Sequence, residues 1–210
     1  MLLYGWKKIQ EFSSENSPAE IRFSIIVPFR NEAKNLPILL KSLAKINYPN
    51  SKFEIILVND ESGDNSVEII EGFPQLHSDF RIKVLDNERT SNSPKKDAIN
   101  TAINAAQFEY IITTDADCQV PGNWLKSYND FIFQTGNKLI AGPVGLNSLP
   151  ASNTNNKRKN ILRNFEDLDV LSLQASTGGA FGIGKAFMCN GANLCYEKDA
   201  FLKVSGFAGN

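Results

Sequence analysis

Two aspartates, Asp115 and Asp117, stand one residue apart after the apolar run 110–114. If this run is a strand, side-chain alternation places both carboxylates on one face at its end. Carboxylate pairs are hard oxygen ligands of the kind that Mg²⁺ or Mn²⁺ prefers and shares with substrate phosphates. Ligands of open α/β sheets bind beyond the carboxyl ends of the strands. The pair therefore suits a metal-assisted reaction on a phosphate compound.

Polar residues also follow two earlier apolar runs. The segment 28–32 (Pro-Phe-Arg-Asn-Glu) follows run 23–27, and the segment 59–64 (Asn-Asp-Glu-Ser-Gly-Asp) follows run 53–58. One such acid can simply cap the next helix, and an Asp-x-Asp pair is common in surface turns. Three acid-bearing strand ends at one sheet edge are better explained by a ligand site. There Asp60 could accept a hydrogen bond from a base N–H, and Glu32 could bond a sugar hydroxyl.

A helix start carries two cations. Ser93 and Pro94 are typical of an N-cap and a first helical position, and Lys95 and Lys96 follow in the first turn. Cations at this end oppose the helix dipole, so an anion bound nearby would explain them. The alternative is two solvated lysines, the usual state of this residue.

Strand and helix patterns alternate along the chain, which predicts an α/β fold with a mostly parallel, doubly wound sheet and helices on both faces. We expect residues 1–20 to form a tail or linker and residues 21–210 to form one domain. Segment 148–159 is polar and predicts a mobile loop, and four glycines between 178 and 184 predict a flexible segment of close approach. The expected strands cover 23–27, 53–58, 81–85, 110–114 and 138–144, and the expected helices 36–46, 65–72, 94–106 and 121–133.

The composition excludes several classes of protein. The 210 residues are 42% hydrophobic and 21% charged, with a formal net charge of −1, so nucleic acid is not expected as a partner. The three cysteines have no metal-ligand spacing and are expected as reduced thiols. With a single histidine, His77, a Ser-His-Asp or Cys-His hydrolase is hard to build.

Two segments suggest a membrane surface. At the start of the chain, Tyr4, Trp6, Lys7 and Lys8 follow apolar residues, as at the cytoplasmic end of a membrane anchor. Segment 157–173 is basic and then amphipathic. A frayed terminus and a helix packed on its own domain are the alternatives. No apolar run has the length of a membrane span, and we expect a cytoplasmic location at the inner face of the cell membrane.

In combination these motifs resemble the family-2 glycosyltransferases, inverting enzymes of the GT-A fold that use nucleotide-diphospho sugars. The resemblance covers about residues 23–207. Segment 26–32 looks like the opening strand and nucleotide loop of the family, which implies substrate contacts by Pro28, Arg30, Asn31 and Glu32. Segment 58–64 is similar to the Val-x-Asp-x-Ser-x-Asp element, in which Asp60 reads the base.

Three further segments extend the resemblance. Segment 95–100 is similar to a Lys-x-x-x-Leu-Asn element that places Lys95 near the nucleotide, and Asp115 to Asp117 matches the Asp-x-Asp metal motif. Segment 187–191 resembles the Phe-x-Cys-Gly-Ser stretch that lines the donor sugar in processive members, which implies Asn190 and Gly191 as substrate contacts. Segment 191–207 looks like the strand and helix that precede the catalytic base.

The resemblance implies a mechanism. Mg²⁺ or Mn²⁺ at Asp115 and Asp117 bridges the diphosphate of the donor, expected to be a UDP-sugar, and stabilises the leaving group. A carboxylate deprotonates the hydroxyl of a saccharide or lipid-linked acceptor, which attacks with inversion. The product would be a cell-envelope polysaccharide.

The sequence departs from the family pattern at its end. The acidic motif that supplies the base and the later Gln-x-x-Arg-Trp motif are both absent, and the chain stops at Asn210. It looks like a donor half with the start of an acceptor half, expected to bind donor without competent transfer. One alternative is a non-catalytic nucleotide-sugar-binding domain. Another is a phosphotransferase of the haloacid-dehalogenase type, which wants Thr or Val where Gln119 stands.

Overall fold

The computed structural model describes residues 1–73, 81–146 and 157–208, the side chains of 157–163 excepted. Contacts divide the chain into two compact units. The larger unit comprises residues 14–140 and 191–210, and the smaller unit comprises residues 1–13 and 141–190. His77 and most of the predicted loop, 148–156, lie outside the described residues, whereas its last three residues begin a helix.

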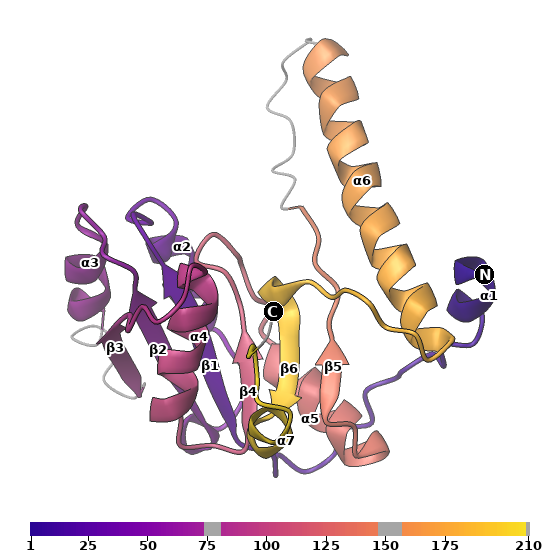
Figure 1. Cartoon of the computed structure of the whole chain (residues 1–210), viewed down its shortest axis with the longest axis horizontal. Helices are drawn as coiled ribbons and strands as arrows, with labels where there is room; N and C mark the ends of the chain where they lie inside the picture. Colours follow the sequence, from indigo (N-terminus) through magenta and orange to yellow (C-terminus); the bar gives the residue numbers. More distant parts are fainter. Residues whose placement is uncertain (74–80, 147–156, 209–210) are drawn as a thin grey trace. The chain divides into compact units, whose positions relative to one another are not determined.

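The larger unit is built on a sheet that has six strands in the described part of the chain, in the order β3-β2-β1-β4-β6-β5 (Figure 1). The first four strands are parallel and β6 runs antiparallel to β4, so the prediction of a mostly parallel sheet is confirmed. The strands are β1 (Phe23–Phe29), β2 (Phe53–Asn59), β3 (Ile82–Asp86), β4 (Tyr110–Thr113), β5 (Leu139–Ala141) and β6 (Leu194–Glu197).

The central strand β1 continues through Pro28, where the sequence predicted that it would stop. On the β4 side, the ladder ends where Thr114 N–H donates to the Ile26 carbonyl. On the β2 side it goes on, and Asp60 N–H donates to the Phe29 carbonyl. Because residues alternate between the two sides, the N–H that proline lacks would face the side whose ladder has already ended.

Both faces of the sheet are buried, which explains why the strands are continuous apolar runs. Along β1, Ile25 and Val27 belong to one core and Ile26 to the other. One core is closed by α2 (Leu36–Leu43), α3 (Ser66–Gly72) and α5 (Trp124–Thr135), and the other by α4 (Pro94–Ala105), followed at the end of the unit by α7 (Lys198–Lys203).

A buried carboxylate on α5 ties down the segment before β1. Asp130 is fully buried, and it accepts hydrogen bonds from Lys126 Nζ at 2.6 Å, from Ser17 N–H at 3.1 Å and from the Ser14 hydroxyl. Burial by itself would raise the pKa of this carboxyl. The hydrogen bonds from Lys126 and Ser14 outweigh burial and lower the pKa of Asp130 to about 2.

In the smaller unit, a short helix packs on a long one through glycine. Gly5 of α1 (Leu2–Trp6) meets α6 (Lys157–Gly182) backbone to backbone. A Cβ built on Gly5 would lie 1.9 Å from the Gly179 carbonyl oxygen, and one on Gly182 would lie 2.0 Å from the Gly5 carbonyl oxygen. A side chain at any of these positions would force the helices apart.

The glycine-rich segment therefore makes the close approach that the sequence predicted. The prediction of a flexible segment is wrong for Gly178, Gly179 and Gly182, because they lie within helix α6. Gly184 follows the helix with φ +67°, a left-handed conformation that favours glycine.

Helix α6 presents apolar side chains to solvent. Phe165, Leu168 and Leu171 are 60% to 67% exposed. Across residues 1–73, 81–146 and 157–208, no helix combines the length and apolar character needed to cross a membrane.

We expect Asp130→Asn to lower the free energy of unfolding by roughly 2 kcal/mol near neutral pH, because each unit of pKa shift corresponds to about 1.4 kcal/mol. A carboxyl with a lowered folded pKa stabilises the fold fully above its ordinary pKa of 3.8 and loses that effect as the pH falls toward about 2. The difference between wild type and variant should therefore shrink over this range. Urea denaturation at several pH values measures it, with Asp199→Asn on exposed α7 as control. A difference that is independent of pH would contradict the expectation.

Candidate functional site

The strand ends of the larger unit meet around one cavity of about 290 Å³. The loops after β1, β2 and β4 and the first turn of α4 all contribute to its lining. Every candidate residue predicted from the sequence lines this cavity except Asn31, Asn190 and Gly191. Those that do are Pro28, Arg30, Glu32, Asp60, Lys95, Asp115 and Asp117.

The three other candidates lie elsewhere. Asn31 has φ +56°, and its side-chain oxygen accepts a hydrogen bond from Gly63 N–H at 2.8 Å, which joins the loops after β1 and β2. Gly191 accepts a hydrogen bond from the Thr113 hydroxyl at 2.6 Å, at the end of β4. Asn190 belongs to the smaller unit and is exposed.

The loop that carries Arg30 and Glu32 is held by the loop after β2. Glu32 N–H donates to the Ser66 hydroxyl at 2.9 Å, and that hydroxyl donates to Asp64. Asp64 also accepts Ala33 N–H at 3.1 Å. The hydrogen bond from Ser66 is the main reason why the pKa of Asp64 lies below its usual value. The last acid of the Asp-x-Ser-x-Asp pattern thus fixes the loop, whereas Asp60 lines the cavity.

The Asp-x-Asp pair reaches the cavity from a turn. Strand β4 ends at Thr113, and Cys118 N–H closes the turn on the Asp115 carbonyl at 3.1 Å. Ala116 is buried between the two acids, Asp115 is half-buried and Asp117 is exposed. Both aspartates line the same cavity, but they come from the turn that follows β4 and not, as the sequence predicted, from one face of the strand.

Lys95 already has an anion beside it. Its Nζ lies 2.6 Å from Asp115 Oδ1 across the cavity. The carboxylate offsets the unfavourable placement of a cation in the first turn of α4.

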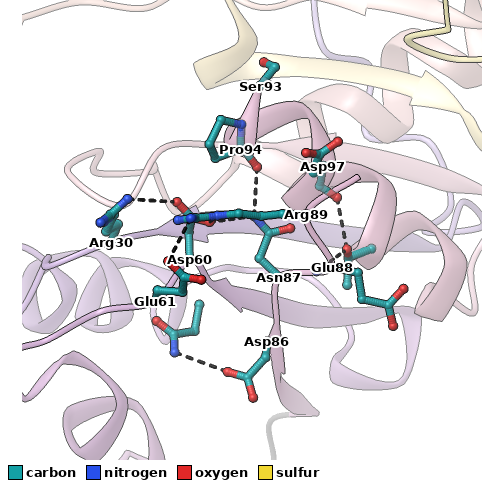
Figure 2. A network of polar contacts seen from close by, with 12 residues as sticks. Arg30, Asp60, Glu61, Asp86, Asn87, Glu88, Arg89, Ser93, Pro94 and Asp97 are labelled. Atoms are coloured by element: carbon teal, nitrogen blue, oxygen red, sulfur yellow. Dashed lines mark hydrogen bonds and ion pairs between the residues drawn. The ribbon is translucent and has the colours of Figure 1, made fainter. Parts of the chain in front are cut away.

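Asp60 is the centre of a polar network (Figure 2). Its Oδ1 accepts hydrogen bonds from Arg89 Nε and from Asn87 Nδ2, both at 2.7 Å. Its Oδ2 lies 3.7 Å from the Arg30 guanidinium. The hydrogen bond from Arg89 is the largest cause that lowers the pKa of Asp60, and burial opposes it. These contacts therefore hold the Asp60 side chain in place and favour its ionised form, which accepts hydrogen bonds.

Arg89 and Asn87 are absent from the sequence-based prediction. They follow β3, whose end at Asp86 is as polar as the ends of the other three parallel strands. That polarity is the signal from which they could have been found. The loop is held in turn by Asp97, which is 2% exposed and accepts backbone and hydroxyl hydrogen bonds from Thr90 and Ser91.

The carboxylates of the cavity suit a metal ion that is shared with a bound ligand better than one that protein side chains hold alone. Among the described residues, no group of three or more His, Cys, Asp and Glu side chains is placed to hold a metal ion. Asp115 and Asp117 nevertheless line one cavity together, and neither is fully buried. Two accessible carboxylates suit Mg²⁺ or Mn²⁺ that takes its other ligands from a phosphate and water.

The sequence model of the family described as Glycosyl transferase family 2 matches residues 24–192, which includes every strand end at the cavity. The chain belongs to this family. Membership decides against the phosphotransferase alternative.

One relative is the poly(ribitol-phosphate) β-N-acetylglucosaminyltransferase TarS of Staphylococcus aureus, 34% identical over 112 residues, which are 53% of this chain and 19% of TarS. The crystal structure of TarS 1–349 in complex with UDP-GlcNAc superposes with a TM-score of 0.54 at 31% identity, over 61% of this chain and 36% of that one. The chain thus spans only part of this relative.

A second structure shows the fold over nearly the whole chain. The mannosyltransferase PcManGT of Pyrobaculum calidifontis, in complex with GDP-Man and Mn²⁺, gives a TM-score of 0.68 at 20% identity. The match covers 98% of this chain and 54% of that one. The expectation of a GT-A fold is confirmed.

We expect Arg89→Met to raise the pKa of Asp60, because the Arg89 hydrogen bond is the main cause that lowers it. Arg30→Met is the matched control and should raise the pKa less, since that guanidinium is 3.7 Å away. Carboxyl ¹³C chemical shifts followed against pH measure both. Equal shifts in the two variants would contradict this assignment.

Proposed function

We propose that the cavity is the donor site of a glycosyltransferase that uses a nucleotide-diphospho sugar, with a UDP-sugar as donor. The observation that carries the proposal is the convergence of Asp60, Lys95, Asp115 and Asp117 on one cavity. Family membership supports it, and so does the UDP-GlcNAc bound by TarS. The transferred group would be a hexosyl residue.

Base recognition rests on Asp60 and Arg89. Uracil presents one N–H between two carbonyl oxygens, so it needs an acceptor flanked by a donor. Asp60 Oδ2, which lies beyond hydrogen-bonding distance of Arg30, would accept the base N–H. The Arg89 guanidinium, 2.7 Å from Asp60 and 2.7 Å from Glu61, offers N–H donors to a neighbouring carbonyl.

The diphosphate and the sugar would take the rest of the cavity. Lys95 and Arg30 supply positive charge, and Glu32 offers a carboxylate to sugar hydroxyls while Asn35 holds it at 2.7 Å. A divalent cation held by Asp115 and Asp117 would supply charge that offsets the developing charge on the leaving diphosphate.

Transfer to a saccharide or lipid-linked acceptor with inversion requires a base for the acceptor hydroxyl. Two acids of the cavity, Asp60 and Asp115, are poorly suited to that role. Asp60 has a lowered pKa and is a weak base, and Asp115 is paired with Lys95. The name of TarS gives a poly(ribitol-phosphate) acceptor, a polymer that carries hydroxyl groups, which supports a hydroxyl as the attacking group.

We expect UDP to bind only with Mg²⁺ or Mn²⁺ present, because the carboxylate pair needs a cation to hold a diphosphate. Calorimetric titration with and without metal measures this, and equal affinity in EDTA would remove the metal from the proposal. Asp117→Ala should abolish the metal dependence of UDP binding.

Asp60→Ala should lower the ratio of the affinity for UDP to the affinity for GDP by about tenfold or more, which corresponds to the loss of one hydrogen bond to a charged group. Asp199→Ala, on exposed α7, should change neither.

We further propose that the smaller unit lies at the cytoplasmic face of a membrane. Tyr4 and Trp6 are 61% and 52% exposed, and Lys8 lies 4.8 Å from the Tyr4 ring centre. Exposed aromatic side chains beside lysines are typical of the lipid–water interface.

We expect the chain to co-sediment with vesicles that contain anionic phospholipid. Replacing Lys7 and Lys8 together by Glu should weaken binding by at least about tenfold, because each lysine near an anionic surface contributes about 1 kcal/mol. Replacement of Lys41 and Lys45 by Glu is the matched control, since both are exposed on the larger unit. If both double variants bind like wild type, the membrane proposal fails.

A further inference from the structure

A lysine stands where the metal site would be. Lys95 Nζ is 2.6 Å from Asp115 Oδ1, and both side chains line the same cavity as Asp117. The pair is partly open to solvent, with 54% of the lysine side chain and 33% of the aspartate side chain exposed. The ammonium therefore occupies an oxygen that a divalent cation would use.

The two cations cannot both hold that oxygen closely. Like charges a few ångströms apart repel strongly in a partly shielded cavity. A cation that binds Asp115 alone must first displace Lys95 and leave the ammonium in the first turn of α4, where the helix dipole disfavours it. Both effects weaken metal binding in the absence of another anion.

A diphosphate changes this balance. Lys95 has a flexible four-carbon stem and sits at the rim of the cavity, so its ammonium can leave Asp115 for a phosphate oxygen without movement of the backbone. The first turn of α4 then carries an anion, which the dipole favours. Asp115 would then be free to hold a divalent cation together with Asp117.

We propose that Lys95 is exchanged between Asp115 and the diphosphate, and that this exchange couples metal binding to nucleotide binding. In the ligand-free protein Lys95 neutralises Asp115 and competes with a metal ion for its carboxylate. The inference rests on the proposed donor site and adds a positioning role for one lysine. By linkage, nucleotide and metal must strengthen the binding of each other by the same factor.

The chain provides a matched control beside Lys95. Lys96 follows it in the same helical turn and carries the same charge, but it does not line the cavity. Its Nζ lies 5.9 Å from the Phe207 ring centre. Lys96→Met therefore removes a cation from the same helix end without touching Asp115.

The test measures Mn²⁺ binding by electron paramagnetic resonance, with and without UDP. Without UDP, Lys95→Met should bind Mn²⁺ about two- to fivefold more tightly than wild type, the range expected when an exposed ion pair no longer competes. Its affinity for UDP with Mn²⁺ should fall, and the mutual strengthening should shrink. Lys96→Met and Lys95→Arg should keep the wild-type affinity for Mn²⁺ alone.

Every outcome of this test either supports or overturns the proposed exchange of Lys95. Unchanged or weaker Mn²⁺ binding by Lys95→Met, including no detectable binding by either protein, overturns the exchange. If wild type binds UDP with Mn²⁺ under those conditions, only the exchange fails. If wild type binds no UDP with Mn²⁺, the donor site itself fails. Thermal unfolding of each variant in buffer shows whether a change in binding comes from the site or from the fold.

Discussion

The parallel pairing of β1 with a neighbour on each side is the constraint on which the site depends. Because β2 and β4 both run parallel to β1, their carboxyl ends reach the same edge of the sheet. The ladder to β4 ends at Ile26, earlier than the ladder to β2, and the strands separate there. The turn with Asp115 and the loop with Arg30 can therefore face one cavity.

These strand ends bring charges of both signs to the cavity, and two of its carboxylates are paired with cations. Asp60 is held by Arg89, and Asp115 by Lys95, so each carboxylate has a cation that comes from another element. Without these partners, several acids around about 290 Å³ would repel one another. The loop that carries Arg89 is itself fixed by Asp97, an acid that does not line this cavity.

Much of the fold was predictable from the sequence, because strands buried on both faces and helices with apolar stripes leave strong patterns in a sequence. The polar strand ends also identified most of the cavity lining. Pro28 was misread because the tolerance of a strand for proline depends on where the neighbouring ladder ends, which is a property of the fold. Arg89 was missed because its role is defined by a partner 29 residues away in the chain. The packing of Gly5 on Gly179 likewise joins distant segments, and glycine alone predicts a loop as readily as a helix contact.

A cavity in which carboxylates are already paired with cations, as Asp60 is with Arg89 and Asp115 with Lys95, would bind ligands by exchange of partners. Replacing one ion pair by another changes the total free energy little, since surface pairs are worth about 1 kcal/mol or less. High affinity then requires ligands that together pair with every charged side chain whose ion pair is broken. In the proposed donor site, a base bonded to Asp60, phosphates bonded to Lys95 and a cation held by Asp115 would meet this condition jointly, whereas each alone would leave a charge unpaired. Such an arrangement favours selectivity for the complete donor over raw affinity for its parts.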